Sequence, residues 1–340
     1  MSEPLLDVRD LSVRFTTADG IVRAVDGLSF TVERGESLGV VGESGSGKSV
    51  TFMAIMGLLN RSYTDVEGEA RFNGQDLLSL SERELRELRG DGIGMVFQDP
   101  MTSLHPMYRV GTQIVEAIRA HREISKDAAW AEAVDILELV GIPSPAERAR
   151  SYPHELSGGM RQRVMIAMGL VLKPDLLIAD EPTTALDVTV QAQVLELIDD
   201  LKRELNIGVV LISHSLGVIA DVCQRVMVMY AGRAVELGGR DDVFLNPLHP
   251  YTWGLLESIP RVGVAKERLV PIEGAPPSLI HLPTGCPFHP RCPHRFEPCD
   301  QERPALADRG SGHQEACHLS PEAKTAAWAA RQARRVEAPA

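Results

Sequence analysis

The chain has 340 residues, of which 44% are hydrophobic and 24% charged, and its formal net charge is −12. This length and apolar content suffice for one large core with a smaller appendage, and the negative charge argues against a nonspecific grip on nucleic acid. No apolar run approaches the roughly 20 residues of a membrane-spanning helix, and the first seven residues lack a signal-peptide profile. We therefore expect a cytoplasmic protein without a nucleic-acid partner, which reaches a membrane only by docking on a protein embedded there.

The N-terminal region predicts strands. Residues 5–40 alternate apolar and polar positions, with turn signals at 19–20 and 34–35. This pattern predicts antiparallel strands that lead into a first parallel strand over residues 37–41, and residues 68–73 continue the antiparallel sheet.

A glycine-rich loop follows the strand at 37–41. It consists of Gly42, Glu43, Ser44, Gly45, Ser46, Gly47, Lys48 and Ser49. Its glycines let the backbone turn N–H groups toward an anion, Lys48 can reach the β- and γ-phosphates, and the hydroxyl of Ser49 can ligate Mg²⁺. A helix expected to begin at Val50 directs its positive end to the same phosphates. Strand, loop, lysine, hydroxyl and helix together predict a nucleotide site rather than a chance glycine-rich turn.

Helical patterns dominate the next region. A capping box, Ser81 with Glu84, opens a short charged helix over 81–89. Residues 110–122 and 128–139 show helical spacing, which predicts an inserted helical subdomain. The run Ser157, Gly158 and Gly159 precedes a helix over 160–173.

The start of this last helix predicts dimerisation. A helix N-terminus is an anion site, and within one compact domain the glycine-rich loop already holds the nucleotide phosphates. A second phosphate-binding helix end therefore makes sense only if it serves the nucleotide of another subunit.

Two carboxylates follow the buried strand expected at 176–179. Asp180 would hold the Mg²⁺ shell and Glu181 would polarise the attacking water, because phosphoryl transfer depends on positioning and charge neutralisation. The alternative is that these acidic residues only cap the next helix.

These motifs, in this order, resemble the ATPase subunits of ATP-binding-cassette (ABC) transporters over roughly residues 5–255. The resemblance implies an α/β P-loop NTPase of the ABC type: a parallel core sheet flanked by helices, an antiparallel β subdomain and a helical subdomain at about 100–160. It implies an ATPase domain over 1–256 that uses ATP and Mg²⁺, with Val50 completing the ATP-binding residues.

The same resemblance assigns further roles. Gln98 is similar to the Q-loop glutamine, which touches Mg²⁺ and takes part in catalysis, and His214 to the switch histidine that contacts the γ-phosphate. Asp187, in the D-loop run of residues 185–187, would join Ser157, Gly158 and Gly159 in contacting the partner's ATP. Phe15 resembles the aromatic residue that stacks on adenine, with Phe30 as its competitor. Ser215 departs from the pattern, because many relatives carry an acidic residue there.

Three segments, 98–106, 185–193 and 246–252, resemble dipeptide and oligopeptide permease ATPases. This resemblance implies a heterodimer with a second homologous ATPase on the cytoplasmic face of the membrane, bound to two permease subunits and served by an extracytoplasmic peptide-binding protein. We expect Met101, Leu104 and Met107 to be exposed and to grip the permease. Nickel, glutathione or an oligosaccharide is the alternative cargo of such a transporter. A non-transport ABC ATPase fits less well, because the sequence has no long coiled-coil insertion.

The C-terminal region changes character. Residues 257–284 form a proline-rich linker, residues 285–320 a cysteine-rich extension, and residues 321–340 a tail expected to fray. The extension carries Cys286, Cys292, Cys299 and Cys317, which in a cytoplasmic protein indicate a metal rather than disulfides. Four thiolates suit a 4Fe–4S cluster, and the same tail in the permease subfamily resembles such a site. Two alternatives remain. The thiols could bind Zn²⁺ together with nearby histidines, or they could carry no metal. The nearby histidines are His289, His294, His313 and His318. Cys223 is expected to be a buried structural thiol.

Overall fold

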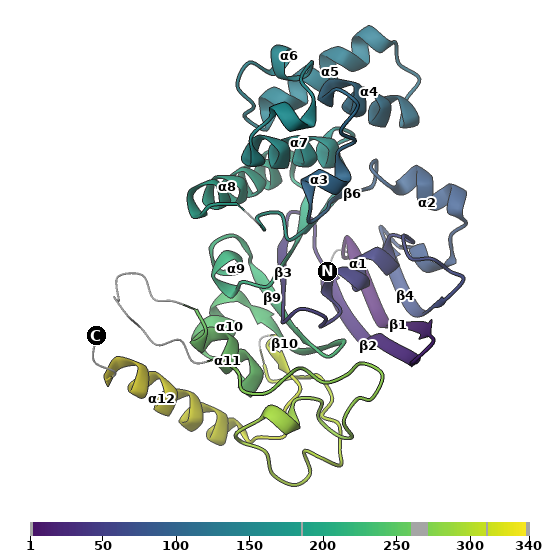
Figure 1. Ribbon diagram of the computed structural model, residues 1–340. Helices are drawn as coiled ribbons and strands as arrows, with labels where there is room; N and C mark the ends of the chain where they lie inside the picture. The colour runs from purple at the N-terminus through teal and green to yellow at the C-terminus, as the bar shows by residue number, and fades with distance from the viewer. Residues whose placement is uncertain (1–2, 185, 260–270, 311, 338–340) are drawn as a thin grey trace. The chain divides into compact units, whose positions relative to one another are not determined.

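The computed structural model describes residues 3–184, 186–259, 271–310 and 312–337, and these form two compact units (Figure 1). The first unit comprises Met1–Asp7, Thr31–Ser37 and Arg71–Ile212, and the second Val8–Phe30, Leu38–Ala70 and Ser213–Ala340. Position 185 of the expected D-loop and residues 260–270 of the expected linker lie outside the described residues. The expected domain boundaries remain predictions.

The first unit contains three parallel strands: β6 (Ile93–Val96), β7 (Leu176–Asp180) and β8 (Gly208–Ser213). Every residue of β7 is buried, since its apolar side chains are covered on both faces, as in other parallel sheets. The carboxyl ends of β6 and β7 lie at one edge, so the residues that follow them are brought together there.

Helices make up most of the rest of this unit. They are α2 (Glu82–Leu88), α3 (Pro100–Ser103), α4 (Val110–His121), α5 (Lys126–Leu139), α6 (Pro145–Arg148), α7 (Gly158–Leu170) and α8 (Val188–Leu205). In Figure 1, α4 to α7 gather into one helical group, in which α4 packs on α5 and α5 on α7. The capping box of Ser81 and Glu84 is confirmed at the start of α2.

The second unit contributes a further set of strands. β3 (Ser37–Val41) pairs in parallel with β9 (Arg225–Tyr230), which pairs in antiparallel with β10 (Arg233–Gly239). β10 is followed by β12 (Gln314–Glu315) and β11 (Ala307–Asp308). Most of β1 (Leu6–Thr17), β2 (Gly20–Val32) and β4 (Thr64–Phe72) also lies in this unit. The end of β4 belongs to the first unit, where Arg71 and Phe72 pair in antiparallel with β5 (Gln75–Asp76).

The helices of the second unit are α1 (Lys48–Ile55), α9 (Leu216–Val222), α10 (Arg240–Leu245), α11 (Pro250–Glu257) and α12 (Pro321–Glu337). Three 3₁₀ turns complete the described elements of the chain: Leu77–Ser79, Pro153–Glu155 and His289–Arg291. Cys223 is buried beside Gly39, as expected for a structural thiol. Among the described residues, no helix is both long enough and apolar enough to cross a membrane.

The expectation of a frayed tail is wrong for residues 321–337, which form α12. Lys324 is only 1% exposed and pairs with the buried Glu315. The indole N–H of Trp328 donates to the carbonyl of Leu245, and Arg331 pairs with Glu257. The helix is therefore held by polar anchors to α10, α11 and β12, which a search for an apolar stripe does not detect.

Candidate functional site

The glycine-rich loop in the second unit has the backbone of a phosphate cradle. Gly47 has φ of 100° and caps α1. A Cβ on Gly47 would lie 2.4 Å from the carbonyl oxygen of Ala24, and one on Gly42 would lie 2.2 Å from that of Met229. Only glycine fits at both positions, so the loop can pass close to its neighbours and turn its N–H groups inward.

Lys48 lies across this loop. Its ammonium donates to the carbonyl oxygens of Gly42, at 2.8 Å, and Glu43, at 3.1 Å, and the residue is only 6% exposed. The buried hydroxyl of Ser46 has no hydrogen-bond partner among the described residues, and Ser49 lies in the first turn of α1. A lysine, an unsatisfied hydroxyl and a helix N-terminus at one place are chemically suited to phosphate oxygens.

The aromatic residues near the start of the chain differ in exposure. Phe30 is buried and packs against Phe52, with ring centroids 5.8 Å apart, so it is a core residue. Phe15 is partly exposed and lies 6.4 Å from the ring of Tyr63, which is itself exposed. Phe15 therefore remains the candidate for adenine stacking, and Tyr63 is a neighbour that sequence reasoning missed.

A carboxylate site lies at the carboxyl edge of β6 and β7, in the first unit. The side-chain amide of Gln98 donates to Glu181 Oε2 at 3.0 Å, and the hydroxyl of Thr184 donates to the same oxygen at 2.9 Å. Glu181 has φ of 47°, a strained value for a non-glycine residue, and its N–H donates to the carbonyl of Ile212 at 2.9 Å. Asp180 is buried at the end of β7. The sequence assigned both Gln98 and Glu181 to catalysis without predicting their contact, and Thr184 was not singled out.

The alternative role of these carboxylates, capping the next helix, is wrong. The cap of α8 is Asp187, whose side chain accepts from the N–H of Val190 at 3.0 Å. Asp180 and Glu181 are therefore available for other chemistry.

The expected partner-facing residues meet at the starts of α7 and α8. Ser157 is exposed, and its hydroxyl caps α7 by accepting from the N–H of Met160 at 3.3 Å. A Cβ on Gly159 would lie 2.7 Å from Val190 Cγ1, so this glycine permits the close approach of the two helices. Ser157, Gly158, Gly159 and Asp187 thus occupy neighbouring helix N-termini.

His214 lies at the end of β8 and is exposed. Its neighbour Ser215 donates its N–H to the hydroxyl of Ser213 at 3.0 Å and precedes α9.

The segment after Gln98 confirms two of three expected exposed residues. Met101 is exposed, and Met107 is 76% exposed. Leu104 is only 2% exposed, so that expectation is wrong: its N–H closes the short helix α3, and its side chain turns into the core. Phe97 and Tyr108 are exposed aromatic residues that the sequence did not single out.

The four cysteines of the extension line one small cavity, together with four histidines: His249, His289, His294 and His318. Among the described residues, no three His, Cys, Asp or Glu side chains are grouped as the ligands of a single metal ion. Burial raises the pKa of the Cys286 thiol, and it raises the pKa of Cys292 to about 11 and that of Cys317 to about 12. These thiols are therefore protonated at neutral pH unless a metal displaces the protons.

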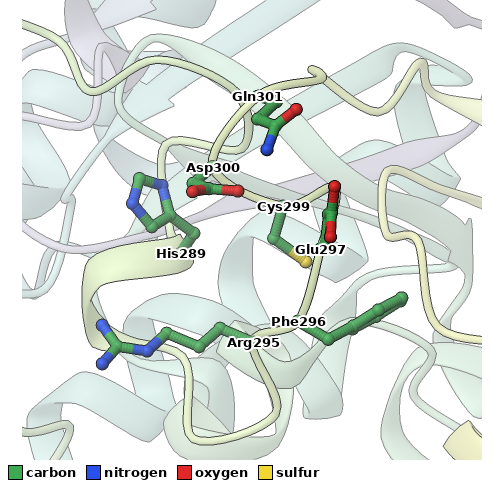
Figure 2. Close-up of a pocket in the computed structure, with 7 residues that line it drawn as sticks. All are labelled: His289, Arg295, Phe296, Glu297, Cys299, Asp300 and Gln301. Carbon is green, nitrogen blue, oxygen red and sulfur yellow. The ribbon is translucent and has the colours of Figure 1, made fainter.

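A second, larger pocket adjoins this cavity. Figure 2 shows its lining, and the pocket has a volume of about 420 Å³. His289 and Cys299 line both spaces, so the pocket and the cysteine cavity share part of their walls.

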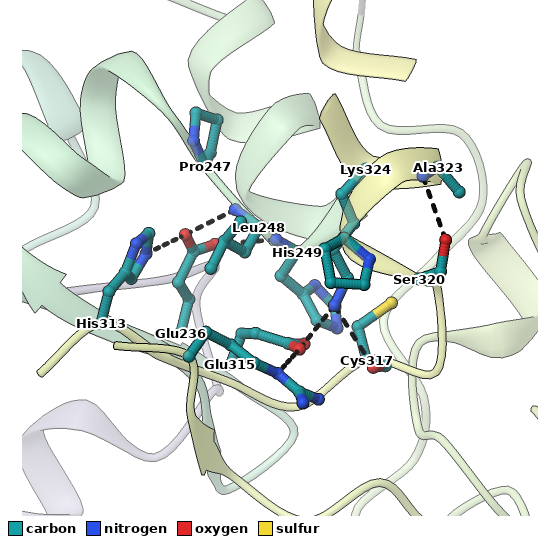
Figure 3. Close-up of polar contacts among 12 residues, drawn as sticks. Glu236, Pro247, Leu248, His249, His313, Glu315, Cys317, Ser320, Ala323 and Lys324 are labelled. Atoms are coloured by element: carbon teal, nitrogen blue, oxygen red, sulfur yellow. Dashed lines mark hydrogen bonds and ion pairs between the residues drawn. The ribbon is translucent and has the colours of Figure 1, made fainter. Parts of the chain in front are cut away.

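Buried charges fix the extension to the sheet (Figure 3). Glu236 on β10 is fully buried and accepts from the N–H groups of Leu248 and His249 and from His313 Nε2, at 2.7, 3.0 and 2.9 Å. Glu315 pairs with Lys324 and with Arg309, and both cations bind its Oε1. Burial, helped by the charge of Lys324, lowers the pKa of His249 to about 3, so this histidine is neutral in the fold.

Comparison with known proteins places these features in context. Residues 25–184 match the ABC transporter family, and residues 235–299 match the oligopeptide/dipeptide transporter C-terminal region. The chain is 53% identical to the oligopeptide transport ATP-binding protein OppD of Haemophilus influenzae, over 94% of this chain and 98% of that protein. It is 52% identical to the dipeptide transport ATP-binding protein DppD of Bacillus subtilis, over 93% of this chain and 95% of that protein.

A solved structure is similar as well. The dimeric structure of MJ0796, a bacterial ABC transporter cassette, aligns with a TM-score of 0.62 and 26% identity, over 69% of this chain and 98% of that one. The expected ABC-type P-loop fold is therefore confirmed.

Proposed function

Because the chain belongs to the family of ABC-transporter ATP-binding proteins for oligopeptides and dipeptides, we propose that it hydrolyses ATP to drive a peptide importer. The observation that carries the proposal is similarity over nearly the whole length, including the C-terminal extension, to proteins named for peptide transport. The phosphate cradle at Lys48 and the oriented carboxylate of Glu181 supply the chemistry for hydrolysis.

The roles of the residues follow from this proposal. The loop from Gly42 to Ser49, with Val50, binds the ATP phosphates, and Phe15 stacks on adenine. Ser49, Gln98 and Asp180 would hold Mg²⁺, which would neutralise charge on the phosphates when bound. Glu181, with His214 and Gln98, orients and polarises the attacking water.

The partners follow from exposed features. Ser157, Gly158, Gly159 and Asp187 contact the nucleotide of a second, homologous ATPase, with which the chain forms a heterodimer. Met101 and Met107, close to Gln98 in the chain, dock on one of two permease subunits, since exposed apolar residues of this kind mark interaction surfaces. The chain then lies on the cytoplasmic face of the membrane, and an extracytoplasmic binding protein delivers the peptide.

Reconstitution tests this function. Vesicles containing the chain, its partner ATPase, the permease subunits and the binding protein should hydrolyse ATP faster when a peptide is added outside and should accumulate that peptide. Nickel, glutathione and oligosaccharides serve as alternative cargoes. Stimulation by one of these but not by peptides would replace the peptide assignment while keeping the ATPase role.

A 4Fe–4S cluster on Cys286, Cys292, Cys299 and Cys317 is the second part of the proposal. Support comes from the donor set: the four thiols line one small cavity, and four thiolates are the ligands that a four-iron cluster requires. Histidines line the same cavity, so Zn²⁺ bound by cysteine and histidine is the alternative. When bound, the cluster would tie four chain positions together and add a redox centre.

A further inference from the structure

Glu43, the second residue of the phosphate loop, is held from outside the loop. Its carboxylate accepts two hydrogen bonds from Arg291 of the cysteine-rich extension: NH1 lies 2.6 Å from Oε2, and NH2 lies 3.0 Å from Oε1. Its N–H donates to the hydroxyl of Tyr251 on α11 at 2.9 Å. A two-pronged arginine–carboxylate pair fixes orientation as well as distance.

The side chain of Arg291 is also held in place by contacts other than the one with Glu43. Its side chain is only 5% exposed, and its Nε and NH2 donate to the carbonyl oxygens of Glu273 and Ile272, at 3.0 and 3.2 Å. Its guanidinium also lies over the ring of Tyr230, 5.8 Å from the centroid. The hydrogen bond to Glu43, which outweighs the cost of burial, raises the pKa of Arg291 further, so this side chain stays charged.

The Arg291–Glu43 ion pair is connected through the loop backbone to the groups expected to bind phosphate. The carbonyl of Glu43 accepts from the ammonium of Lys48, and Gly42 packs against the carbonyl of Met229, the residue before Tyr230. A displacement of Glu43 therefore displaces the backbone on which Lys48 rests. In a phosphate loop, the orientation of the backbone N–H groups and of the lysine side chain determines the affinity for the nucleotide phosphates.

Arg291 lies in the short stretch between the first two cysteines of the extension. The same stretch contains Phe288, which is buried against the rings of Tyr230 and Tyr251 with centroids 5.2 and 5.4 Å away. One short segment thus inserts an aromatic ring and a cation behind the phosphate loop.

We propose that Arg291 is a positioning residue for nucleotide binding: through Glu43 it holds the phosphate loop in its binding geometry, so that ATP affinity depends on the cysteine-rich extension. The proposal deepens the ATPase function proposed above and does not depend on which metal the cysteines bind.

The test is a double-mutant cycle with a matched control. Full-length Arg291→Gln, Glu43→Gln and the double variant are compared with wild type for equilibrium binding of a non-hydrolysable ATP analogue. In the assembled complex, KM and kcat are measured separately. Arg303→Gln is the control, because Arg303 belongs to the same extension and pairs with Asp26 of β2 at 3.0 Å, and among the described residues it forms no ion pair with the phosphate loop.

We expect Arg291→Gln to weaken analogue binding and raise the KM for ATP roughly tenfold, with kcat changed much less. The double variant should bind no more weakly than the weaker single variant, because both substitutions break one interaction. Arg291→Lys, which keeps the charge but not the two-pronged geometry, should lie between wild type and Arg291→Gln. Arg303→Gln should bind normally.

Unchanged analogue affinity in a folded Arg291→Gln protein, additive effects in the cycle, or an equal loss in Arg303→Gln would each overturn the proposal. If Arg291→Gln does not fold, Arg291→Lys and Glu43→Gln decide the question in the same assay. Failure of the wild-type chain to bind the analogue would instead reject the ATPase function itself.

Discussion

Glu181 combines an unusual backbone conformation with a side chain that is oriented from two sides. Its positive φ is a strained conformation, and such strain is often found at functional positions. Gln98 and Thr184 both donate to one carboxylate oxygen, Oε2, and so orient the carboxylate. This arrangement suits a group that must present a carboxylate to water.

We predict that Glu181→Gln lowers ATP turnover in the assembled transporter by roughly 10²–10⁴-fold, because glutamine keeps the shape but cannot accept a proton or polarise water as well. ATP binding should persist, and the variant should accumulate an ATP-bound dimer. Phosphate release and nucleotide occupancy measure the two effects, with Glu196→Gln on the exposed side of α8 as the control. Wild-type turnover in Glu181→Gln would refute the assignment.

Gly47 allows a second prediction at the scale of one residue. Gly47→Ala would place a side chain on a left-handed backbone, and its Cβ would lie 2.4 Å from the carbonyl oxygen of Ala24. We therefore expect weaker ATP binding and a lower melting temperature. Gly310 has φ of 113° with nothing within 4 Å of its Cβ position, so Gly310→Ala provides the strain without the clash. Strain alone costs about 1–2 kcal/mol. Equal losses of stability in the two variants would show that the close contact at Gly47 is unimportant.

The backbone of the glycine-rich loop was predictable because the motif is local in the sequence. The glycines, Lys48 and Ser49 are adjacent in sequence, so their joint role can be inferred without tertiary information. Thr184 and Tyr63 were missed because each becomes relevant only through a neighbour in space. Leu104 was wrongly expected to be exposed, since a four-residue helix gives no periodicity from which to infer its buried side.

At the scale of elements, helices with apolar stripes were predicted best. The helices expected at 110–122 and 128–139 appear as α4 and α5, with Ile114, Ile118 and Leu137 buried. α12 was not predicted, because its anchors are Lys324, Trp328 and Arg331, which bind carbonyl and carboxylate oxygens of other segments. A polar anchor becomes recognisable only when its partner is placed.

The N-terminus of α7 permits a test of the proposed heterodimer. In the assembled complex, Ser157→Arg should abolish hydrolysis at the site whose phosphate loop belongs to the partner, because it removes the cap and adds bulk and charge at the exposed helix start. The isolated chain should bind ATP as wild type does. Site-specific hydrolysis is measured with the partner's own catalytic glutamate intact or replaced.

The control for this experiment is Ser125→Arg, which removes the equivalent cap of α5. Loss of a cap costs about 1 kcal/mol in either variant, so any difference in hydrolysis reports the nucleotide contact rather than helix stability. If Ser157→Arg destroys ATP binding by the isolated chain, the partner-facing role of this residue is wrong.

At the scale of the whole molecule, the extension is built into the second unit rather than loosely attached. Its strand β12 pairs with β10, its His313 hydrogen-bonds to the buried Glu236 on that strand, and Arg291 pairs with Glu43 of the phosphate loop. The proline-rich sequence predicted that the extension has little hydrophobic core of its own. In the structure, the extension is ordered by strand pairing with the sheet and by hydrogen bonds and ion pairs of buried side chains. The extension can therefore influence nucleotide binding without containing any residue of the ATP site.

The cysteines provide the last prediction. Anaerobically purified protein should be brown, with broad absorbance in the visible blue and about four irons and four labile sulfides per chain. Replacing Cys286, Cys292, Cys299 or Cys317 by serine should remove iron and loosen the extension, as measured by iron content and limited proteolysis, before ATP binding is lost. The reason is that the extension is short and proline-rich, so that a bound cluster contributes order that burial alone does not.

Cys223→Ser is the matched control for this experiment. Cys223 is buried against Gly39 and does not line the cavity of the other four cysteines, so this variant should retain its iron even if its stability falls. Colourless protein with one zinc and no labile sulfide would replace the cluster by the Cys/His zinc alternative, and metal-free protein after anaerobic purification would reject both. Because the thiol pKa values of Cys292 and Cys317 are raised, cluster loss should leave protonated thiols that react slowly with alkylating reagents at neutral pH, unlike an ordinary exposed cysteine.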